Sequence, residues 1–334
     1  MSTLSVIENN QEIRGQSVST LKPGAHVEGC LLVRTASQRL NKNGRAYYDL
    51  LLADRTGEIS CKMWDISNTA CPAANTVVSI RGEVELFRDR LQLKITFMEE
   101  ASQPVDMSSL VTAAPKSADE MMAEITAAID SFGSDKLKAL TRRMLEKAAG
   151  CLGYYPAAMR LHHAEKSGLL HHTTDMLRVA RAICECYPAL RRDLLFAGVI
   201  IHDLAKTVEM ESDENGTVRD YTVDGNLIGH IVRGVVWLEE AARETGIMEG
   251  ENQPELVQLL EHMMLSHHGV PEFGSVRYPA FPEALVLNMI DNLDANLNEM
   301  QSVMSRVTEG AFSERIPYMD DRRIYHPFYT DDAD

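Results

Sequence analysis

Short runs of alternating hydrophobic and polar residues recur through residues 20–100, a pattern that is typical of β-strands. The alternation predicts strands at 27–34, 46–52, 58–64, 77–87 and 91–97. Asp54 and Gly57 suit a hairpin turn between the second and third of these strands, and Arg88-Asp89-Arg90 suits a second hairpin. We therefore expect an all-β module here, preceded by a polar segment at 1–16.

A non-strand interval at 65–74 separates the third predicted strand from the fourth. Five strands in this order are the arrangement of an OB-fold barrel. Such a barrel binds its ligand across the second and third strands, between the loop that follows the first strand and the loop that follows the fourth. The fold therefore predicts where on this module a ligand would lie.

Both of those loops are basic, and strand alternation places Lys62 and Trp64 on the outward side. A base can stack on the tryptophan while cationic side chains follow the phosphate backbone of a single strand. Hairpin tips are commonly polar, however, and a tryptophan can simply cap a barrel core, so both explanations stay open here. The candidate nucleic-acid-binding residues are Arg39, Lys42, Arg45, Lys62, Trp64, Arg88 and Arg90.

From residue 119 the hydrophobic spacing changes to that of helices, with Met121, Ile125, Ile129 and Phe132 on one face. Helical stretches alternate with short loops to about residue 306, and the one sheet-like segment is a small hairpin around 217–223. Pro, Ser and Ala in 101–118 predict a linker, and the acidic residues 331–334 predict a solvated tail. We predict a multidomain chain, with an all-β OB-fold barrel at 18–100 and an all-α domain at 119–327.

Composition is consistent with two cytosolic domains. The chain has 334 residues and 45% hydrophobic residues, which is sufficient for proper cores. No run approaches the roughly 20 apolar residues of a membrane span, and residues 1–16 lack the apolar core of a signal peptide. The six cysteines are scattered, and the Cys184-x-Cys186 pair has no histidines at zinc-finger spacing, so we expect free thiols.

The net charge of −16 argues against a nucleic-acid partner, but its distribution weakens that argument. Residues 1–100 carry 12 basic and 12 acidic side chains, whereas residues 101–334 carry 21 basic and 37 acidic ones. An acidic domain that binds cations can still handle phosphates, because the metal ions supply the local positive charge. The charge therefore leaves a phosphate-containing substrate open.

Nine of the eleven histidines lie between His162 and His268, and an apolar run ending in His202-Asp203 lies near the middle of them. A neutral imidazole offers one lone pair and a carboxylate offers two oxygens, so this dipeptide can hold one cation and share it with a second. Any one histidine is more often a packed or capping residue. The whole set is harder to explain in that way, because each clustered ring would require a separate partner.

The candidate metal ligands each fall at an end or on one face of a predicted helix. They are His172, His202, Asp203, His230, His267, His268 and Asp291, with the primary ligand of the His267-His268 pair left open. Imidazoles with two carboxylates suit Mn²⁺, Fe²⁺ or Zn²⁺ better than Mg²⁺ alone. Two ions about 3.5–4 Å apart can bind a phosphodiester and supply a hydroxide in line with the leaving group. Asp203 would bridge them, and Lys206 would stabilise the phosphoryl charge, unless it is an ordinary exposed lysine.

The ordered set resembles the HD-domain metal-dependent phosphohydrolases, and further motifs resemble the bacterial YhaM-type 3′-5′ exoribonucleases. In the helical region these motifs are Pro156-Ala157-Ala158, His162-His163-Ala164, Gly168-Leu169-Leu170-x-His172-Thr173, Gly229-His230-Ile231, Ser266-His267-His268-Gly269, Phe273-Gly274-Ser275 and Asp291-Asn292-Leu293-Asp294-Ala295. In the barrel they are Asn43-Gly44-x-x-Tyr47 and Asp54-x-Thr56-Gly57-Glu58-Ile59. The resemblance covers roughly residues 18–327, and an OB barrel placed before an HD domain is more specific than the His-Asp pair.

The resemblance implies that the seven candidate ligands hold two divalent ions, with Mn²⁺ favoured and Fe²⁺, Zn²⁺ or Co²⁺ compatible. It implies catalytic roles for Asp203, Lys206 and His163, the last two near the scissile phosphate. The implied partner is single-stranded RNA, with single-stranded DNA left open, and we expect a homo-oligomer without membrane association. The implied products are nucleoside monophosphates released from the 3′ end.

Three positions depart from the family's pattern. His171 stands where an acidic residue is expected, Ala205 replaces a glycine before Lys206, and Lys166-Ser167 replaces part of a glycine-rich turn. Every candidate ligand is intact, so we expect these changes to affect the rate or the substrate preference.

Two other functions are compatible with the same residues. One is an HD-domain phosphodiesterase that acts on small or cyclic nucleotides, with the barrel serving only assembly. The other is a nucleic-acid-binding adaptor with a structural metal site. The adaptor ranks last, because structural sites are usually closed by about four ligands and this set is larger.

Overall fold

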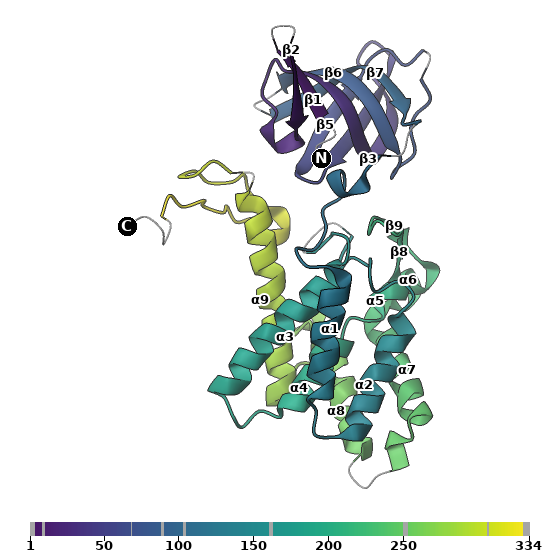
Figure 1. Ribbon diagram of the computed structural model, residues 1–334, viewed down its shortest axis with the longest axis vertical. Helices are drawn as coiled ribbons and strands as arrows, with labels where there is room; N and C mark the ends of the chain where they lie inside the picture. Colours follow the sequence, from purple (N-terminus) through teal and green to yellow (C-terminus); the bar gives the residue numbers. More distant parts are fainter. Residues whose placement is uncertain are drawn as a thin grey trace. The chain divides into compact units, whose positions relative to one another are not determined.

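The computed structural model describes residues 4–8, 11–67, 69–87, 90–102, 105–159, 163–249, 253–305 and 307–329 (Figure 1). The chain divides into two compact units, Met1–Ala113 and Ala114–Asp334. The boundary falls inside the segment 101–118, for which a linker is predicted. The predicted solvated tail at 331–334 lies outside the described residues. Within the described part of the chain, no helix is both long enough and apolar enough to cross a bilayer.

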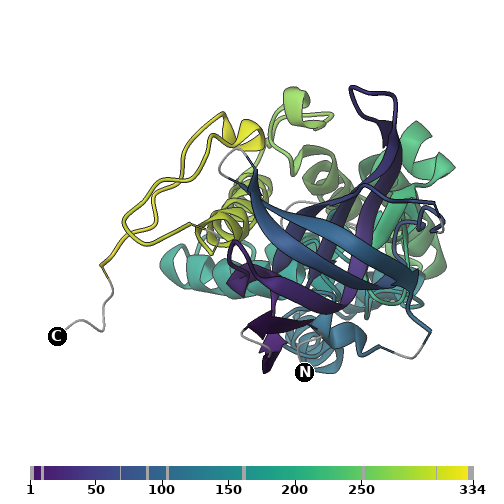
Figure 2. The ribbon, with the colours of Figure 1, turned by 90° about the horizontal axis from the view of Figure 1, so that it is seen from above.

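The first unit contains a closed barrel (Figures 1 and 2). Its strands are β3 (His26–Leu40), β4 (Ala46–Asp54), β5 (Gly57–Met63), β6 (Val77–Phe87) and β7 (Arg90–Glu100). They pair in the order β3-β4-β5-β7-β6, and β6 pairs back to β3 to close the barrel. Only the β5–β7 pairing among these is parallel. This connectivity is that of an OB fold, so the predicted fold of this unit is confirmed.

Alternating side chains fill the barrel, as the sequence pattern requires. Leu31, Leu50, Cys61, Ile80 and Leu93, one from each strand, are buried in a single hydrophobic core. Their neighbours along each strand face outward, because successive side chains of a strand point to opposite sides of the sheet. The outward side of β4 and β5 is therefore free to carry polar and aromatic residues.

The barrel differs from the prediction in two places. Strand β3 continues to Leu40, where the sequence predicts an end at residue 34, because its second half pairs with β4 in a register that runs to Leu40↔Ala46. This half is mostly exposed, so it lacks the apolar alternation that marks a strand. Two further strands, β1 (Leu4–Glu8) and β2 (Gln11–Gln16), form a hairpin on β3, with Leu4 and Val6 buried.

In its described residues the second unit is helical apart from one small hairpin and two isolated β-bridges, Phe312↔Tyr325 and Ile316↔Arg322, so the predicted all-α class is confirmed. Its helices are α1 (Ala118–Asp130), α2 (Asp135–Ala148), α3 (Gly168–Cys186), α4 (Arg192–Ile201), α5 (Lys206–Glu209), α6 (Val223–Leu227), α7 (Gly229–Glu244), α8 (Gln253–Ser266) and α9 (Pro282–Met304). The hairpin pairs β8 (Met210–Ser212) with β9 (Val218–Tyr221). The predicted hairpin at 217–223 thus supplies only its second strand.

Local sequence explains where the first helices begin. Ser117 caps α1 through a reciprocal capping box with Glu120, and Ser134 accepts a hydrogen bond from the Leu137 backbone N–H at the start of α2. Short 3₁₀ turns complete the chain, at Val18–Thr20, Met107–Ser109, Ile247–Glu249, Pro271–Phe273 and Pro317–Met319.

Helix α4 is the centre of the helical core. Residues 194–201 are all buried, and the helix packs against α1, α2, α3, α8 and α9. A helix that is apolar on every side can be stable only inside such a core. Its C-terminal end therefore delivers His202 and Asp203 to the interior of the unit, with His202 fully buried and Asp203 nearly so.

Candidate metal centre and nucleic-acid face

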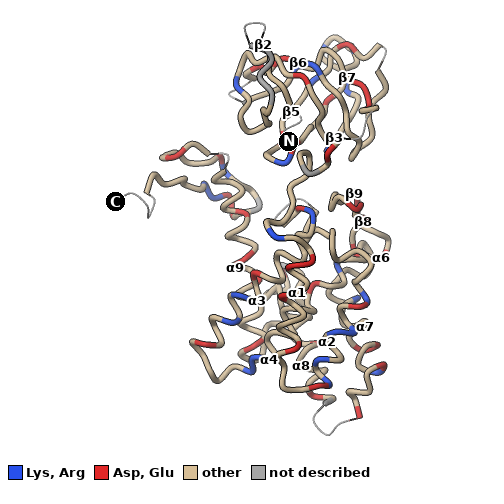
Figure 3. Tube along the Cα trace, in the orientation of Figure 1, with Lys and Arg blue, Asp and Glu red and all other residues tan. Residues whose placement is uncertain are grey.

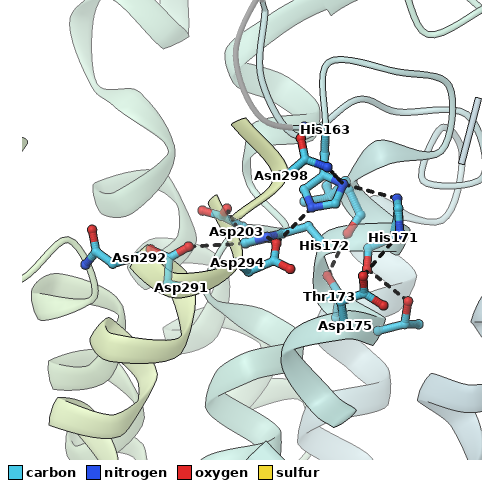
Figure 4. A network of polar contacts seen from close by, with 12 residues as sticks. His163, His171, His172, Thr173, Asp175, Asp203, Asp291, Asn292, Asp294 and Asn298 are labelled. Carbon is cyan, nitrogen blue, oxygen red and sulfur yellow. Dashed lines mark hydrogen bonds and ion pairs between the residues drawn. The ribbon is translucent and has the colours of Figure 1, made fainter. Parts of the chain in front are cut away.

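The seven candidate ligands converge on one buried point, although they come from separate helices. His172 lies on α3, His202 and Asp203 follow α4, and His230 is the second residue of α7. His267 and His268 directly follow α8, and Asp291 lies on α9. Figure 4 shows His172, Asp203 and Asp291 approaching one another from these elements.

Asp203 lies between two groups of imidazoles. Its Oδ2 is 3.4 Å from His202 Nε2 and 3.9 Å from His172 Nε2. Its Oδ1 is 3.4 Å from His230 Nε2 and 3.6 Å from His267 Nε2. The two carboxylate oxygens thus face two different histidine pairs, which is the arrangement a bridging ligand requires.

Each group has one further candidate ligand. Asp291 Oδ1 is 3.2 Å from His172 Nε2, and the His268 ring lies 4.1 Å from that of His267 and 5.5 Å from that of His230. Ligand atoms of His172, His202 and Asp291 lie within 4.8 Å of one another, as do those of His230, His267 and His268. The structure therefore contains two groups of three donors, with Asp203 between them.

The Nδ1 atoms of four of these histidines are anchored by hydrogen bonds. Val199 O and Met264 O lie 2.9 Å and 2.7 Å from the Nδ1 atoms of His202 and His267. Asp294 Oδ2 and Glu209 Oε1 lie 2.6 Å and 2.8 Å from the Nδ1 atoms of His172 and His230. An imidazole that donates from Nδ1 carries its lone pair on Nε2, and this anchoring is typical of metal-bound histidines.

The atoms that face the centre fit a cation. Among the described residues, the buried Nε2 atoms of His202, His230 and His267 and the buried Oδ1 of Asp203 have no hydrogen-bond partner. Buried polar atoms without partners are rare and costly. A divalent ion between them would engage these lone pairs, so the residues present suit a metal centre.

The charges at the centre support the same conclusion. Burial raises the pKa of Asp203, but Lys206 and His202 outweigh it and hold that pKa well below its usual value. The pKa of Asp291 is lowered as well, since the neighbouring His172 outweighs the effect of burial. The neighbouring cationic groups thus favour the ionised form of both carboxylates, which is the form that ligates a metal.

Lys206 lies against Asp203, with its Nζ 2.6 Å from Oδ2. A turn separates α4 from α5, and Lys206 is the first residue of α5. The prediction places this lysine beside the scissile phosphate. In the structure its ammonium group neutralises the carboxylate between the two histidine groups, and its side chain is only 11% exposed.

Two carboxylates that anchor the ligands are absent from the sequence-based set. Asp294 lies one helical turn after Asp291 on α9, so the spacing of the two residues in the sequence could have placed Asp294 on the same helix face as Asp291. Glu209 accepts from His230 at both Nδ1 and the backbone N–H, at 2.8 and 3.0 Å. This contact joins α5 to the start of α7, and nothing in the sequence indicates it.

His163 lies beside this centre, one carboxylate away from His172 (Figure 4). Its Nε2 is 2.8 Å from Asp294 Oδ2, the same oxygen that His172 contacts. Its backbone N–H donates to Asn298 Oδ1 at 3.0 Å, and the residue is only 3% exposed. The structure therefore joins His163 to the metal ligands through Asp294.

The departures from the family's pattern have local structural consequences. Ser167 has φ 63°, in the left-handed region that favours glycine, and its hydroxyl donates to Gly153 O at 2.7 Å. Ala205 has φ −73° and ψ −5°, a backbone conformation that does not require glycine. His171 lies between two carboxylates, with Nδ1 2.7 Å from Glu165 Oε1 and Nε2 3.2 Å from Asp175 Oδ2.

We expect Gly168→Ala to destabilise the protein and to displace His163. A Cβ at residue 168 would lie 2.0 Å from His163 O, an atom that accepts a hydrogen bond from the Ala157 N–H. Backbone cannot yield as a flexible side chain does, so we expect a loss of about 1–3 kcal/mol in the free energy of unfolding. Thermal or urea denaturation measures it. The matched control is Gly150→Ala, whose Cβ meets nothing within 4 Å. Equal stability of the two variants would contradict this account.

The predicted nucleic-acid face of the barrel contains an aromatic pair. Trp64, 42% exposed, packs against Tyr47 with ring centroids 4.6 Å apart. Lys62 Nζ lies 5.5 Å from the centre of the Tyr47 ring and 2.5 Å from Asp49 Oδ1, and Arg39 Nε lies 3.2 Å from Asp49 Oδ2. Tyr47 is absent from the sequence-based set, although alternation in the second strand places it on the outward side.

The other predicted basic residues are more dispersed. Lys42 and Arg45 are exposed between β3 and β4. Arg88 lies outside the described residues, and Arg90 is the first residue of β7. Basic and acidic residues are interspersed over the unit (Figure 3), so its surface is not of one sign. The face thus offers two aromatic rings in a tilted contact, together with two cationic side chains, Arg39 and Lys62, that share Asp49.

Comparison with known proteins defines first the class of the helical unit and then the family of the chain. The HD domain family model matches residues 169–296, so this unit carries an HD domain. The chain is 40% identical over 308 residues to the 3′-5′ exoribonuclease YhaM of Halalkalibacterium halodurans, covering 91% of this chain and 94% of that protein. It is 39% identical over 310 residues to the YhaM of Listeria innocua, covering 92% and 96%. The chain belongs to the YhaM family of 3′-5′ exoribonucleases.

Solved structures resemble parts of the chain more distantly. The second OB-fold domain of replication protein A from Methanococcus maripaludis is 18% identical, with a TM-score of 0.23, and the match covers 27% of this chain and 98% of that one. A replication protein A heterotrimer bound to single-stranded DNA is 17% identical, with a TM-score of 0.21, over 29% of this chain and 69% of that one. The OB assignment therefore rests on the strand connectivity.

Proposed function

We propose that this protein is a metal-dependent 3′-5′ exoribonuclease that releases nucleoside monophosphates from single-stranded RNA. The observation that carries the proposal is the position of Asp203, whose two carboxylate oxygens face two separate groups of buried imidazole nitrogens. A centre of that form suits phosphodiester hydrolysis by two metal ions. The activity named for its relatives is of the same class.

The seven ligands have distinct proposed tasks. His172, His202 and Asp291 would hold one ion, His230, His267 and His268 the other, and Asp203 would bridge them. Two such ions, with Mn²⁺ favoured and Fe²⁺, Zn²⁺ or Co²⁺ compatible, supply Lewis acidity and an activated water when bound. Asp294 and Glu209 fix the ring orientation of His172 and His230. Lys206 limits the negative charge at Asp203 and so helps a phosphate to approach.

The barrel would hold the substrate. Tyr47 and Trp64 offer exposed ring surface for bases, and stacking of this kind does not depend on sequence. Arg39, Lys42, Arg45 and Lys62 would contact the phosphate backbone. Base stacking does not distinguish ribose from deoxyribose, so we extend the proposal to single-stranded DNA as a second substrate. We also retain the expectation of a homo-oligomer, which light scattering in solution measures.

A ladder assay tests the proposal. Full-length protein loaded with Mn²⁺ should shorten 5′-labelled single-stranded RNA stepwise from its 3′ end and release nucleoside monophosphates. An RNA of the same sequence blocked by a 3′-phosphate is the control, and EDTA should stop the reaction until Mn²⁺ is restored in excess. Intact RNA in the presence of protein with measured bound metal would refute the proposal. Cleavage confined to cyclic or other small nucleotides would favour the phosphodiesterase alternative.

A further inference from the structure

A second group of donor atoms lies beside the metal centre, between the start of α3 and the loop before it (Figure 4). His163 Nδ1 and His171 Nδ1 are 3.1 Å apart. Glu165 Oε1 is 3.4 Å from the first of these atoms and 2.7 Å from the second. These three residues are separate from the seven ligands described above.

Both imidazoles are anchored through their other ring nitrogen. His163 Nε2 lies 2.8 Å from Asp294 Oδ2, and His171 Nε2 lies 3.2 Å from Asp175 Oδ2. A histidine whose second ring nitrogen donates to a carboxylate is the common form of a metal ligand. With a cation bound, each ring would carry its lone pair on Nδ1, the atom that lies beside the Glu165 oxygen. Without a cation the three atoms are joined by hydrogen bonds, and Asn298 Nδ2 lies 3.4 Å from His163 Nδ1 as a further donor.

The dimensions of the group suit a metal ion. Ligands about 2.0–2.1 Å from a tetrahedral ion stand about 3.3–3.4 Å from one another. Two of the three separations here, 3.1 and 3.4 Å, are close to that size, and the third, 2.7 Å between His171 Nδ1 and Glu165 Oε1, is a hydrogen-bond length that would have to increase when an ion binds. Two imidazoles and a carboxylate are also the donor set of zinc sites that keep a fourth position open. The Glu165 and His171 side chains are 13% and 16% exposed, which gives an ion access from solvent.

We propose that His163, Glu165 and His171 form a third divalent-cation site. The site would be linked to the main centre, because His163 Nε2 and His172 Nδ1 contact the same oxygen of Asp294. A cation on His163 Nδ1 fixes the proton of that ring on Nε2, which directs it towards Asp294. Asp294 in turn orients His172. The third ion would therefore position a ligand of the main centre from outside it.

Counting bound metal tests the proposal independently of nuclease activity. Full-length protein is stripped with chelator, reloaded with Zn²⁺ or with Mn²⁺, dialysed, and measured by mass spectrometry. We expect His171→Phe and Glu165→Gln each to bind one ion fewer per chain than the unaltered protein. His262→Phe is the matched control, since His262 lies outside the group and its Nε2 accepts from the Ala280 N–H. Asp203→Asn should lose ions of the main centre and keep the third.

Equal metal content in His171→Phe, Glu165→Gln and the unaltered protein would overturn the proposal and leave the group as a network of hydrogen bonds.

If either variant unfolds, judged by circular dichroism, Asp175→Asn replaces it. That change keeps all three donors but replaces the carboxylate that anchors His171 with a neutral, weaker acceptor, and we expect it to weaken binding of the last ion about 10–100-fold; unchanged affinity would count against the site. An active enzyme with only two ions would overturn this inference alone, and an inactive enzyme with three would overturn the proposed function alone.

Discussion

Asp203→Asn is expected to lower the rate of RNA hydrolysis by about 10³-fold or more, because a metal centre supplies several kcal/mol of transition-state stabilisation. The two carboxylate oxygens of Asp203 face the two histidine groups, one oxygen to each group. An asparagine keeps the shape but offers one oxygen and an amide NH₂, which cannot ligate a metal on the second side. The measurement is kcat on labelled RNA together with the metal content of the same sample.

The control for this change is Asp220→Asn, which removes an exposed carboxylate from β9. We expect that variant to retain its activity and its metal. A folded Asp203→Asn protein with full nuclease activity would refute the role of Asp203. If the unaltered protein is also inactive and the substitution lowers only the thermal stability, the adaptor with a structural metal site is favoured.

Combined Tyr47→Ala and Trp64→Ala substitutions should reduce kcat/KM for single-stranded RNA by about 10²-fold, since base stacking contributes roughly 1–3 kcal/mol per base. Each ring supports the other at a centroid distance of 4.6 Å, so removal of both eliminates the platform. A chromogenic phosphodiester that carries no base should be affected far less. The two substrates are compared at the same enzyme and Mn²⁺ concentrations.

Phe97→Ala is the matched control, because Phe97 is 40% exposed on β7, where Arg81 covers its ring. We expect this variant to bind and degrade RNA normally. Equal losses on RNA and on the small phosphodiester in the double variant would mean that the barrel serves assembly, as the phosphodiesterase alternative requires. The same outcome would remove Trp64 from the set of nucleic-acid contacts.

The class and connectivity of both units could be predicted from sequence because their cores follow simple periods. Alternation marks the strands that fill the barrel, and the all-apolar run of residues 199–201 marks the buried end of α4. The second half of β3 has no such signal, since its side chains face solvent on both sides. The sequence does not predict the hairpin of β1 and β2 for a related reason, because its short strands lie in a largely polar segment.

The sequence predicts which residues belong to the candidate site, but it does not predict how they are arranged in space. Clustering of histidines and the family resemblance indicate which residues belong to it. Convergence, however, is a property of the packing of α3, α4, α7, α8 and α9, which no local pattern encodes. The pairing of Lys206 with Asp203, the anchor that Glu209 provides and the contact of Tyr47 with Trp64 all depend on tertiary distances.

The buried donor atoms around Asp203 would also make the folding stability of the protein depend on bound metal. A ligand that binds only the folded chain adds to its stability by mass action, by about 2.7 kcal/mol at a hundredfold excess over its Kd. The Nε2 atoms of His202, His230 and His267 have no hydrogen-bond partner in the described part of the chain, so a metal ion that binds them would stabilise the folded chain. Under metal starvation the chain would lose stability along with activity, and proteolysis would lower its abundance. The supply of metal ions would thereby set the amount of enzyme as well as its rate.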